Sequence, residues 1–334
     1  MKFKKKGIFF TFIAVLMLGA IIFFLTPKSE PEIKKNDITN KARIESVDKI
    51  VSALSGSLTK TIVDATVYRA LLSMTLYINK TGKYLDKENF NKYVSDIMYN
   101  GTLNGSSIDT LTGQKIMENN TFKNWTERVS TIINSTYKVA LTGYKINTTI
   151  AQIQPWQIQA FIVVNYSIVS ETATWTGPTE LTSRIEIEGM IDPYYLRESN
   201  GLIPRIVRQD NRQFFQWSIT SLRKAIRNST YIHWPDSKAP SFLMRFVNQT
   251  GNSSCCGIES VVNPNELTTP DRLVSYVDYH FFSGHFTSLN CSVLYNITNP
   301  GGSIGLWDEF PYIKLDYKST VWYNISALDR KLAC

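Results

Sequence analysis

Residues 4–25 read KKKGIFFTFIAVLMLGAIIFFL, a lysine cluster and a glycine followed by 18 residues without charge, Ile8 to Leu25. As an α-helix this run is about 27 Å long, close to the ~30 Å hydrocarbon core of a bilayer. Lysines on the N-terminal side favour a cytoplasmic N-terminus. The sequence therefore predicts a cytoplasmic stub over 1–6, a transmembrane helix over 7–26 in contact with lipid, and an extracellular location for the rest of the chain.

The apolar run differs from a removable signal peptide, whose apolar core has about 7–15 residues and ends at small residues. Before Pro27 stand Phe24, Leu25 and Thr26, which fit a small-residue cleavage pocket poorly. An uncleaved anchor or pilin-type processing is therefore the main prediction. A cleaved signal, or a helix buried in a soluble protein, is the alternative.

The order of basic residues, Gly7 and an apolar helix resembles the class III signal of type IV pilins and archaeal pilin-like proteins. This resemblance implies cleavage between Gly7 and Ile8, which leaves an apolar helix in the membrane or in a filament core. The chain departs from the pattern at Phe12, where many pilins carry glutamate. It departs again at Pro27 and Pro31, which break a helix that pilins continue into the head domain. Filament assembly is therefore an alternative to simple membrane tethering.

Half of the net positive charge of the chain lies in its N-terminal lysine cluster, where it bears on membrane topology. The formal charge is +8, from 36 Lys and Arg against 28 Asp and Glu. Four of the lysines lie within residues 1–6, and every acidic residue follows residue 26, so residues 27–334 carry only +4 (32 − 28). A small and scattered charge of this kind argues against a nucleic-acid partner.

The length and composition of the chain suit one or two extracellular domains, with 334 residues of which 43% are hydrophobic. Residues 27–37 (PKSEPEIKKND) are polar, charged and interrupted by two prolines, which indicates a short linker. We expect a first domain over 38–190 and a second over 191–334.

N-glycosylation sequons are far more frequent than chance. Of 24 asparagines, 14 begin an N-x-S/T triplet, where roughly four would be expected by chance. Such an excess predicts an extracellular, glycan-coated surface. The predicted acceptors are Asn79, Asn100, Asn104, Asn119, Asn124, Asn134, Asn147, Asn165, Asn228, Asn248, Asn252, Asn290, Asn296 and Asn324.

The four cysteines, Cys255, Cys256, Cys291 and Cys334, all lie in the last quarter of the chain. Disulfides suit the same extracellular compartment. Because a bond between neighbours strains the peptide that joins them, we expect Cys255 and Cys256 to pair separately with Cys291 and Cys334, in an order that the sequence leaves open. Free thiols and a metal site are the alternatives.

Three helices are predicted before the first strands. Residues 38–78 carry apolar side chains at intervals of three and four, which is typical of one face of an amphipathic helix, with Asp37 as its N-cap. This stripe packs either on the protein's own sheet or, as a near-heptad, on a partner or filament. Two shorter helices follow over about 86–99, ending at Asn100-Gly101, and over about 112–135, the second with Trp125, Val129 and Ile132 on its apolar face. The GTLNGSS stretch between them is expected to be a loop.

Three strand-like segments come next, over 137–153, 156–174 and 179–190. Their alternation of polar and apolar residues and their short connections predict an antiparallel meander covered on one face by the helices. The fold class is therefore α+β, with a second, disulfide-stapled α+β module after residue 190. In that module we expect a helix over 211–228 with Phe215, Ile219, Leu222 and Ile226 on one face. Residues 274–282, 291–297 and 312–325 are strand-like.

Three stretches carry a wider resemblance: IEIEGMIDPYY from Ile185 to Tyr195, PSFLMR from Pro240 to Arg245, and CCGIES from Cys255 to Ser260. Together with the basic N-terminus and the apolar helix, they resemble a family of uncharacterised archaeal membrane-anchored surface proteins. The resemblance follows the order of segments over most of the chain. It implies a location and a lineage, and no activity.

Few residues suggest chemistry. Asp278, His280 and His285 can be combined into a metal site or a hydrolytic dyad, but aromatic packing explains the YHFF run better. Gly301 to Gly305 reads G-x-S-x-G, yet no histidine follows it, so a glycine-rich turn is favoured over a nucleophile elbow. Asp308 and Glu309 lie beside Trp307 and Phe310. A solvated turn is favoured there over a site for a cation or a sugar. No catalytic, cofactor-binding or metal-ligating residue is predicted.

These observations predict a membrane-tethered, N-glycosylated surface protein with a structural or adhesive role, whose partners are the bilayer and other surface proteins. The first alternative is a pilin-like subunit that is processed after Gly7 and assembles into a filament. The second is an anchored cell-surface glycan hydrolase.

Overall fold

The computed structural model describes residues 41, 44–49, 51–52, 56–170, 173–283, 293–298 and 306–333. The chain divides into two compact units, residues 1–52 and 53–334. In the first unit, residues 41, 44–49 and 51–52 are helical. No helix of the described residues combines the length and apolar character needed to cross a bilayer. The predicted span over 7–26 and the linker over 27–37 lie outside them.

The second unit is α+β, with antiparallel sheets and, over its described residues, ten α-helices. Its first part contains α3 (Ser57–Thr81), α4 (Phe90–Asn100), β1 (Thr102–Leu103), β2 (Ser106–Ser107), α5 (Ile108–Thr112), α6 (Phe122–Tyr137), β3 (Ala140–Gln154), β4 (Gln157–Val169) and β5 (Thr174–Glu186). Its second part contains α7 (Pro193–Glu198), α8 (Ile219–Asn228), α9 (Phe242–Arg245), α10 (Asp278–Ser283), β6 (Leu294–Ile297), α11 (Leu306–Glu309), β7 (Lys314–Asp316), α12 (Tyr317–Trp322) and β8 (Arg330–Leu332).

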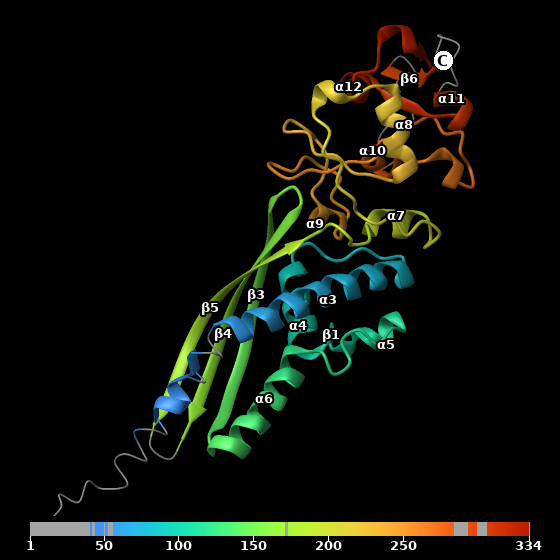
Figure 1. Cartoon of the computed structure of the whole chain (residues 1–334). Helices are drawn as coiled ribbons and strands as arrows, with labels where there is room; N and C mark the ends of the chain where they lie inside the picture. Colours follow the sequence, from blue (N-terminus) through green and yellow to red (C-terminus); the bar gives the residue numbers. More distant parts are fainter. Residues whose placement is uncertain are drawn as a thin grey trace, which may run out of the picture. The chain divides into compact units, whose positions relative to one another are not determined.

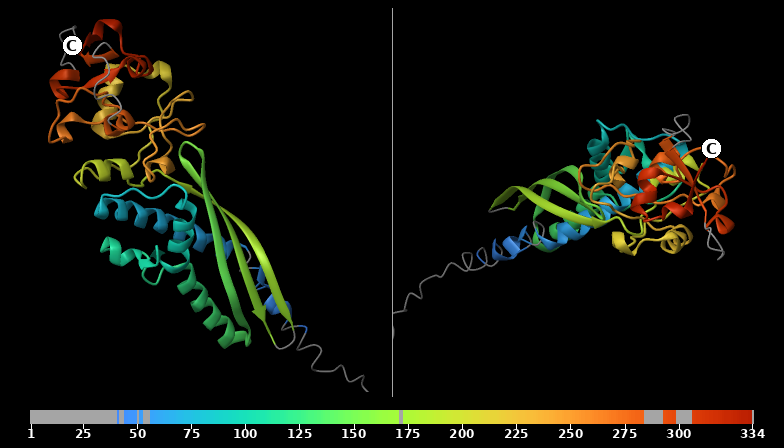
Figure 2. Two further views of the ribbon diagram at one scale, coloured as in Figure 1. Left: turned by 180° about the vertical axis from the view of Figure 1, so that it is seen from behind. Right: turned by 90° about the horizontal axis from the view of Figure 1, so that it is seen from above.

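The predicted antiparallel meander is confirmed. The strands lie side by side in the sheet in the order β3-β4-β5, and each neighbouring pair is antiparallel (Figures 1 and 2). Alternate residues of the central strand β4 face inward, and Ile158, Ala160, Ile162 and Val164 are at most 1% exposed. Phe161, in contrast, lies on the outer face and is 46% exposed. This period of two places one apolar face toward the core and one face toward solvent.

Helices α3, α4 and α6 contact the inner side of this sheet (Figure 1). The open edge of β3 is covered by α4, because Asn91 Oδ1 accepts from the backbone N–H of Ile150 (3.0 Å) and Ser95 Oγ from that of Thr148 (2.9 Å). These bonds satisfy backbone donors that an edge strand otherwise exposes. The helices therefore cover one face of the sheet in the first part, as expected.

The long helix predicted over 38–78 needs correction. The helix does not pass through Gly56, whose backbone is not helical; α3 begins at Ser57 and continues to Thr81. The apolar face is thereby shifted. The spacing of threes and fours from Ile44 places Ala65 on this face, but Ala65 is exposed, whereas Val63, Val67 and Met74 are fully buried in the core. A glycine between serines is a poor helix former, so the periodicity cannot be carried across residue 56. From Val63 onward the stripe packs inside its own unit.

Two further details of the first half differ from expectation. The GTLNGSS stretch forms a small hairpin, β1–β2, whose turn residues Asn104 and Gly105 both have positive φ (51° and 80°). An Asn-Gly pair favours this turn because both residues tolerate the left-handed region. The third helix begins only at Phe122, because Thr121 caps it by accepting from Asn124 N, and Ile132 is 62% exposed rather than buried.

In the second part a small sheet has the order β7-β6-β8. Residues 278–282 and 317–322 belong to the segments expected to be strand-like, but they are helical and lie in α10 and α12. Asp316 explains the second case, because its carboxylate caps α12 at Ser319 N (2.9 Å). The predicted helix over 211–228 is shortened to α8, since Ser218 caps it. Phe215 therefore lies outside the helix and is 76% exposed, while Leu222 and Ile226 are buried as expected.

Candidate functional site

The cysteine pairing differs from the sequence-based expectation. Cys255 and Cys256 are bonded to each other, so the scheme that joins them separately to Cys291 and Cys334 is wrong for this pair. Those two remote cysteines lie outside the described residues. The expectation considered only the strain in the ring that a bond between adjacent cysteines closes. In the structure both sulfur atoms pack against the backbone of Gln152, near the end of β3.

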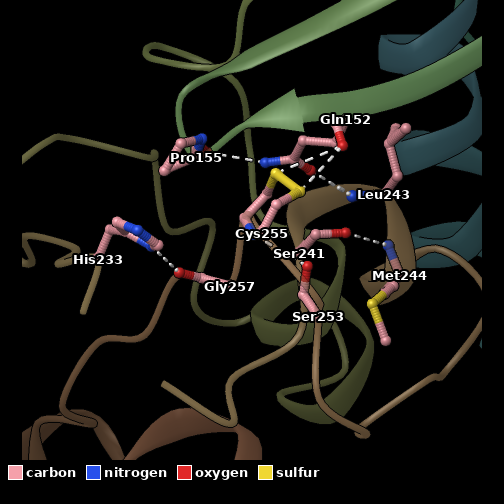
Figure 3. Close-up of a disulfide and its surroundings, with 10 residues drawn as sticks. Gln152, Pro155, His233, Ser241, Leu243, Met244, Ser253, Cys255 and Gly257 are labelled. Atoms are coloured by element: carbon pink, nitrogen blue, oxygen red, sulfur yellow. Dashed lines mark hydrogen bonds between the residues drawn. A yellow bond between two sulfur atoms is a disulfide. The ribbon is translucent and has the colours of Figure 1, made fainter. Parts of the chain in front are cut away.

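Both sulfur atoms face the backbone oxygen of Gln152, at 3.5 Å from Cys255 and 3.4 Å from Cys256 (Figure 3). Because disulfide sulfurs carry no hydrogen, these are close S···O contacts rather than hydrogen bonds. The Gln152 side chain donates to Pro155 O (2.8 Å) and accepts from Leu243 N (3.1 Å). The β3–β4 turn is thereby linked to α9 and to the cysteine pair.

A fully buried cluster of charges lies at the centre of the second part. Arg245, Asp192 and Asp278 have no exposed side-chain surface, and Arg245 Nη1 lies 2.6 Å from Asp192 Oδ2 and 2.9 Å from Asp278 Oδ2. Arg245 Nη2 also donates to Ile258 O. Buried charges persist in proteins only when they are paired and hydrogen-bonded, and this cluster meets both conditions.

Neutral groups complete this cluster. Asp192 caps α7 through Tyr194 N (2.8 Å) and accepts from Tyr231 OH (2.7 Å). Asp278 accepts from Ser260 Oγ at 2.9 Å. Burial raises the pKa of Asp192, and the Arg245 guanidinium opposes that rise. Each buried carboxylate oxygen of Asp192 and Asp278 therefore accepts at least one hydrogen bond.

From this cluster a chain of polar groups leads to Arg205. Ser260 Oγ lies 2.8 Å from Tyr195 OH, which accepts from Arg205 Nη1 at 2.6 Å. Arg205 is 3% exposed and also donates to Val261 O (3.1 Å). Its guanidinium carbon lies 4.5 Å from the centre of the Tyr195 ring, within cation–π distance. Arg205 also lines a surface pocket, so the buried cluster is connected to the surface.

A second buried acid, Glu259, occupies an aromatic setting. Its Oε1 accepts from Trp234 Nε1 (3.0 Å) and Tyr323 OH (3.1 Å), and its Oε2 from Ser237 Oγ (3.3 Å). Burial raises its pKa to about 7 from the usual 4.5; the nearby carboxylate of Asp278 adds to the rise and the hydrogen bonds oppose it. The protonation of Glu259 therefore changes near neutral pH.

Three pockets of about 270, 420 and 360 Å³ meet beside the loop that follows α7. The first two share Leu202, Ile203 and Glu266 as walls, and the first and third share Glu198 and Phe282. We call these three adjoining pockets together the α7 groove. Its charged lining residues are Arg197, Glu198, Arg205, Arg208, Glu266 and Arg272.

The residues considered for chemistry are placed as follows. The Asp278 carboxylate points inward to Arg245, and His280 packs its ring on Tyr279 (centroids 4.1 Å apart). His233 Nδ1 donates to Gly257 O at 2.7 Å, which fixes its tautomer. His285 and the G-x-S-x-G stretch at 301–305 lie outside the described residues. No set of three His, Cys, Asp or Glu side chains within the described ranges is arranged as a metal site.

Glu309, considered above as part of a solvated turn, makes ion pairs. Arg227 Nη2 donates to Glu309 Oε2 at 2.6 Å, and Arg223 Nε lies 3.6 Å from the same oxygen. The hydrogen bond from Arg227 lowers the pKa of this carboxyl. Glu309 therefore ties α11 to α8.

The buried charge cluster was not predicted, although a signal for it was present. The stretches 185–195, 240–245 and 255–260 supply Asp192, Arg245 and Ser260. The structure brings these three stretches to one place. Each contains a charged or polar residue within an apolar run, which is the pattern of a buried ion pair.

Comparison of the chain with protein-family models, curated proteins and solved structures gave no match.

Proposed function

We propose that the protein is a membrane-tethered, N-glycosylated surface protein with a structural or adhesive role, its N-terminus cytoplasmic and its bulk extracellular. The observation that carries this proposal is the excess of sequons together with their accessibility. Thirteen of the 14 sequon asparagines fall in the described residues, where eleven have exposed side chains and two, Asn124 and Asn296, are half-buried. A glycan can be attached only where the asparagine reaches solvent.

The outer face of the sheet supports the same proposal. Asn147 on β3 pairs with Val163, and Asn165 on β4 pairs with Lys145, so the two asparagines are diagonal neighbours on one face. Both are exposed. Glycans at these positions would cover a face that carries the exposed apolar side chains Phe161 (46%) and Val169 (40%). Shielding of this kind suits a protein that faces the outside of a cell.

The buried acids favour a structural role for this region over a catalytic one. Asp192 and Glu259, whose pKa values are raised, are at most 3% exposed and are hydrogen-bonded on both sides. A catalytic acid has to reach its substrate. The disulfide between Cys255 and Cys256 is in keeping with an oxidising compartment.

Protease treatment of intact cells tests the proposed topology. Cells that produce the full chain are treated with a non-permeant protease, and the chain is followed with an antibody against residues 314–333. Loss of the signal on intact cells, together with protection of a cytoplasmic control protein, is expected. Full protection of the C-terminal region on intact cells, with digestion only after lysis, would contradict the proposal.

A second candidate, a pilin-like filament subunit, is favoured by one observation, the Gly7-Ile8 junction between the lysines and the apolar run. Mass spectrometry of the N-terminal peptide from purified membranes separates the two. A mature chain that begins at Ile8 would favour the filament subunit. A chain that retains Met1 would favour the permanent anchor.

A further inference from the structure

The α7 groove is lined by more arginines than acids. Within the described residues, Arg205, Arg208 and Arg272 make no ion pair, whereas Glu198 is paired with Arg197 at 3.0 Å. Glu266 accepts a hydrogen bond from Asn263 Nδ2 (3.2 Å) and is the remaining acid of the lining. The groove therefore presents an excess of positive charge. The exposed arginines, Arg208 and Arg272, favour ligands that carry carboxylates or phosphates.

The arginines are held by different means. Arg208 and Arg272 are exposed, and Arg272 lies over the Phe281 ring at 4.6 Å, which limits where its guanidinium can point. Arg205 is fixed beneath the groove by Tyr195 OH and Val261 O, and its Nε has no hydrogen-bond partner among the described residues. A guanidinium that is already oriented loses less freedom when it binds an anion.

The walls of the groove are apolar. Leu202 is 71% exposed and Ile206 39%, and Ile203, Leu267 and Phe282 line the same pockets. Aliphatic walls of this kind gain by burying apolar side chains. A saccharide offers hydroxyl groups to such walls, whereas a peptide can offer leucine-like side chains and carboxylates in alternation. The combination favours a peptide over an acidic sugar.

We propose that the α7 groove binds an extended acidic peptide segment of a partner protein, with its carboxylates on Arg208 and Arg272 and its apolar side chains on Leu202 and Ile206. The positive charge of the buried Arg205 adds to the attraction between the peptide carboxylates and the groove. This inference deepens the proposed adhesive role and rests on it, because it names the kind of partner that such a surface would hold.

Fluorescence anisotropy on the full chain in detergent tests the proposal. The probe is a fluorescein-labelled hexapeptide of alternating leucine and glutamate with blocked ends. Saturable binding is expected. Arg208→Gln and Arg272→Gln should each weaken it about tenfold, the usual effect of losing one charge-assisted hydrogen bond. Arg184→Gln, at an exposed position on β5 outside the groove, should bind like the wild type.

Two control ligands define what would overturn the proposal. The same peptide with glutamine in place of glutamate should bind at least tenfold more weakly, and an oligogalacturonate should not compete. Absence of saturable binding, equal binding of the glutamine peptide, full competition by the oligogalacturonate, or equal losses in Arg184→Gln and Arg208→Gln would each refute it. None of these results bears on protease accessibility at the cell surface, so failure here is separable from failure of the proposed function.

Discussion

Replacement of Glu259 by glutamine should remove a pH dependence from the stability of the protein. Glu259 is 3% exposed, and burial raises its pKa to about 7, against 4.5 for a solvated glutamate. Between these two values the folded chain holds a proton that the unfolded chain has released. The unfolded state then binds fewer protons, so the free energy of unfolding falls as the pH rises through this window.

The size of the effect follows from the two pKa values. One pKa unit corresponds to about 1.4 kcal/mol, so this group alone lowers the free energy of unfolding by about 3 kcal/mol between pH 4.5 and pH 8. Glutamine keeps the acceptor for Trp234 Nε1 and Tyr323 OH and carries no charge at any pH. Glu259→Gln should therefore be more stable than the wild type by less than about 1 kcal/mol at pH 5 and by about 3 kcal/mol at pH 8.

Urea unfolding of the full chain, followed by tryptophan fluorescence at pH 5, 6, 7 and 8, measures this difference. Trp234 contacts the carboxylate directly and reports on its surroundings. Glu186→Gln is the matched control, because Glu186 is exposed on β5, and its difference from the wild type should stay within about 0.5 kcal/mol at every pH. A difference between the wild type and Glu259→Gln that does not change with pH, or that favours the wild type at pH 8, would refute the reasoning.

Two other substitutions test the packing of the second part. Arg245→Met should lower the free energy of unfolding by about 3–5 kcal/mol, because it leaves two buried carboxylates without their counter-charge; an unchanged urea midpoint would contradict the importance of the cluster. Gly257→Ala places a Cβ in a clash with the backbone oxygen of Ala239 and should cost about 1–3 kcal/mol. Gly251→Ala, with open space around its Cβ, should be close to neutral in the same assay.

The sheet and its helical cover could be predicted because each depends on neighbours in the sequence. Residues 157–160 alternate between polar and apolar and an apolar centre follows them, and β4 occupies Gln157–Val169. The end of α4 was signalled by Asn100-Gly101, and Gly101 does adopt a positive φ of 73°. In both cases the physical cause lies in residues that are close together in the sequence, so one sequence is enough to predict the element.

The errors arose where a local break or a distant contact decided the outcome. Gly56 resets the phase of the first helical stripe, and Asp316 converts a strand-like run into α12. The ion pairs of Arg245 join residues 53 and 33 positions away, which periodicity does not register. The cysteine pairing failed for the same reason, because packing against Gln152 is not visible in the sequence around Cys255.

Site-resolved mass spectrometry of glycopeptides from purified membranes tests the central claim most directly. Asn147 and Asn165 are exposed on the outer face of the sheet and should carry glycans. Asn124 and Asn296, which are half-buried, should be modified less. Occupancy that follows exposure in this way is the result that a glycosylated surface protein predicts. Unmodified asparagine at both Asn147 and Asn165 in the membrane-derived protein would contradict the account.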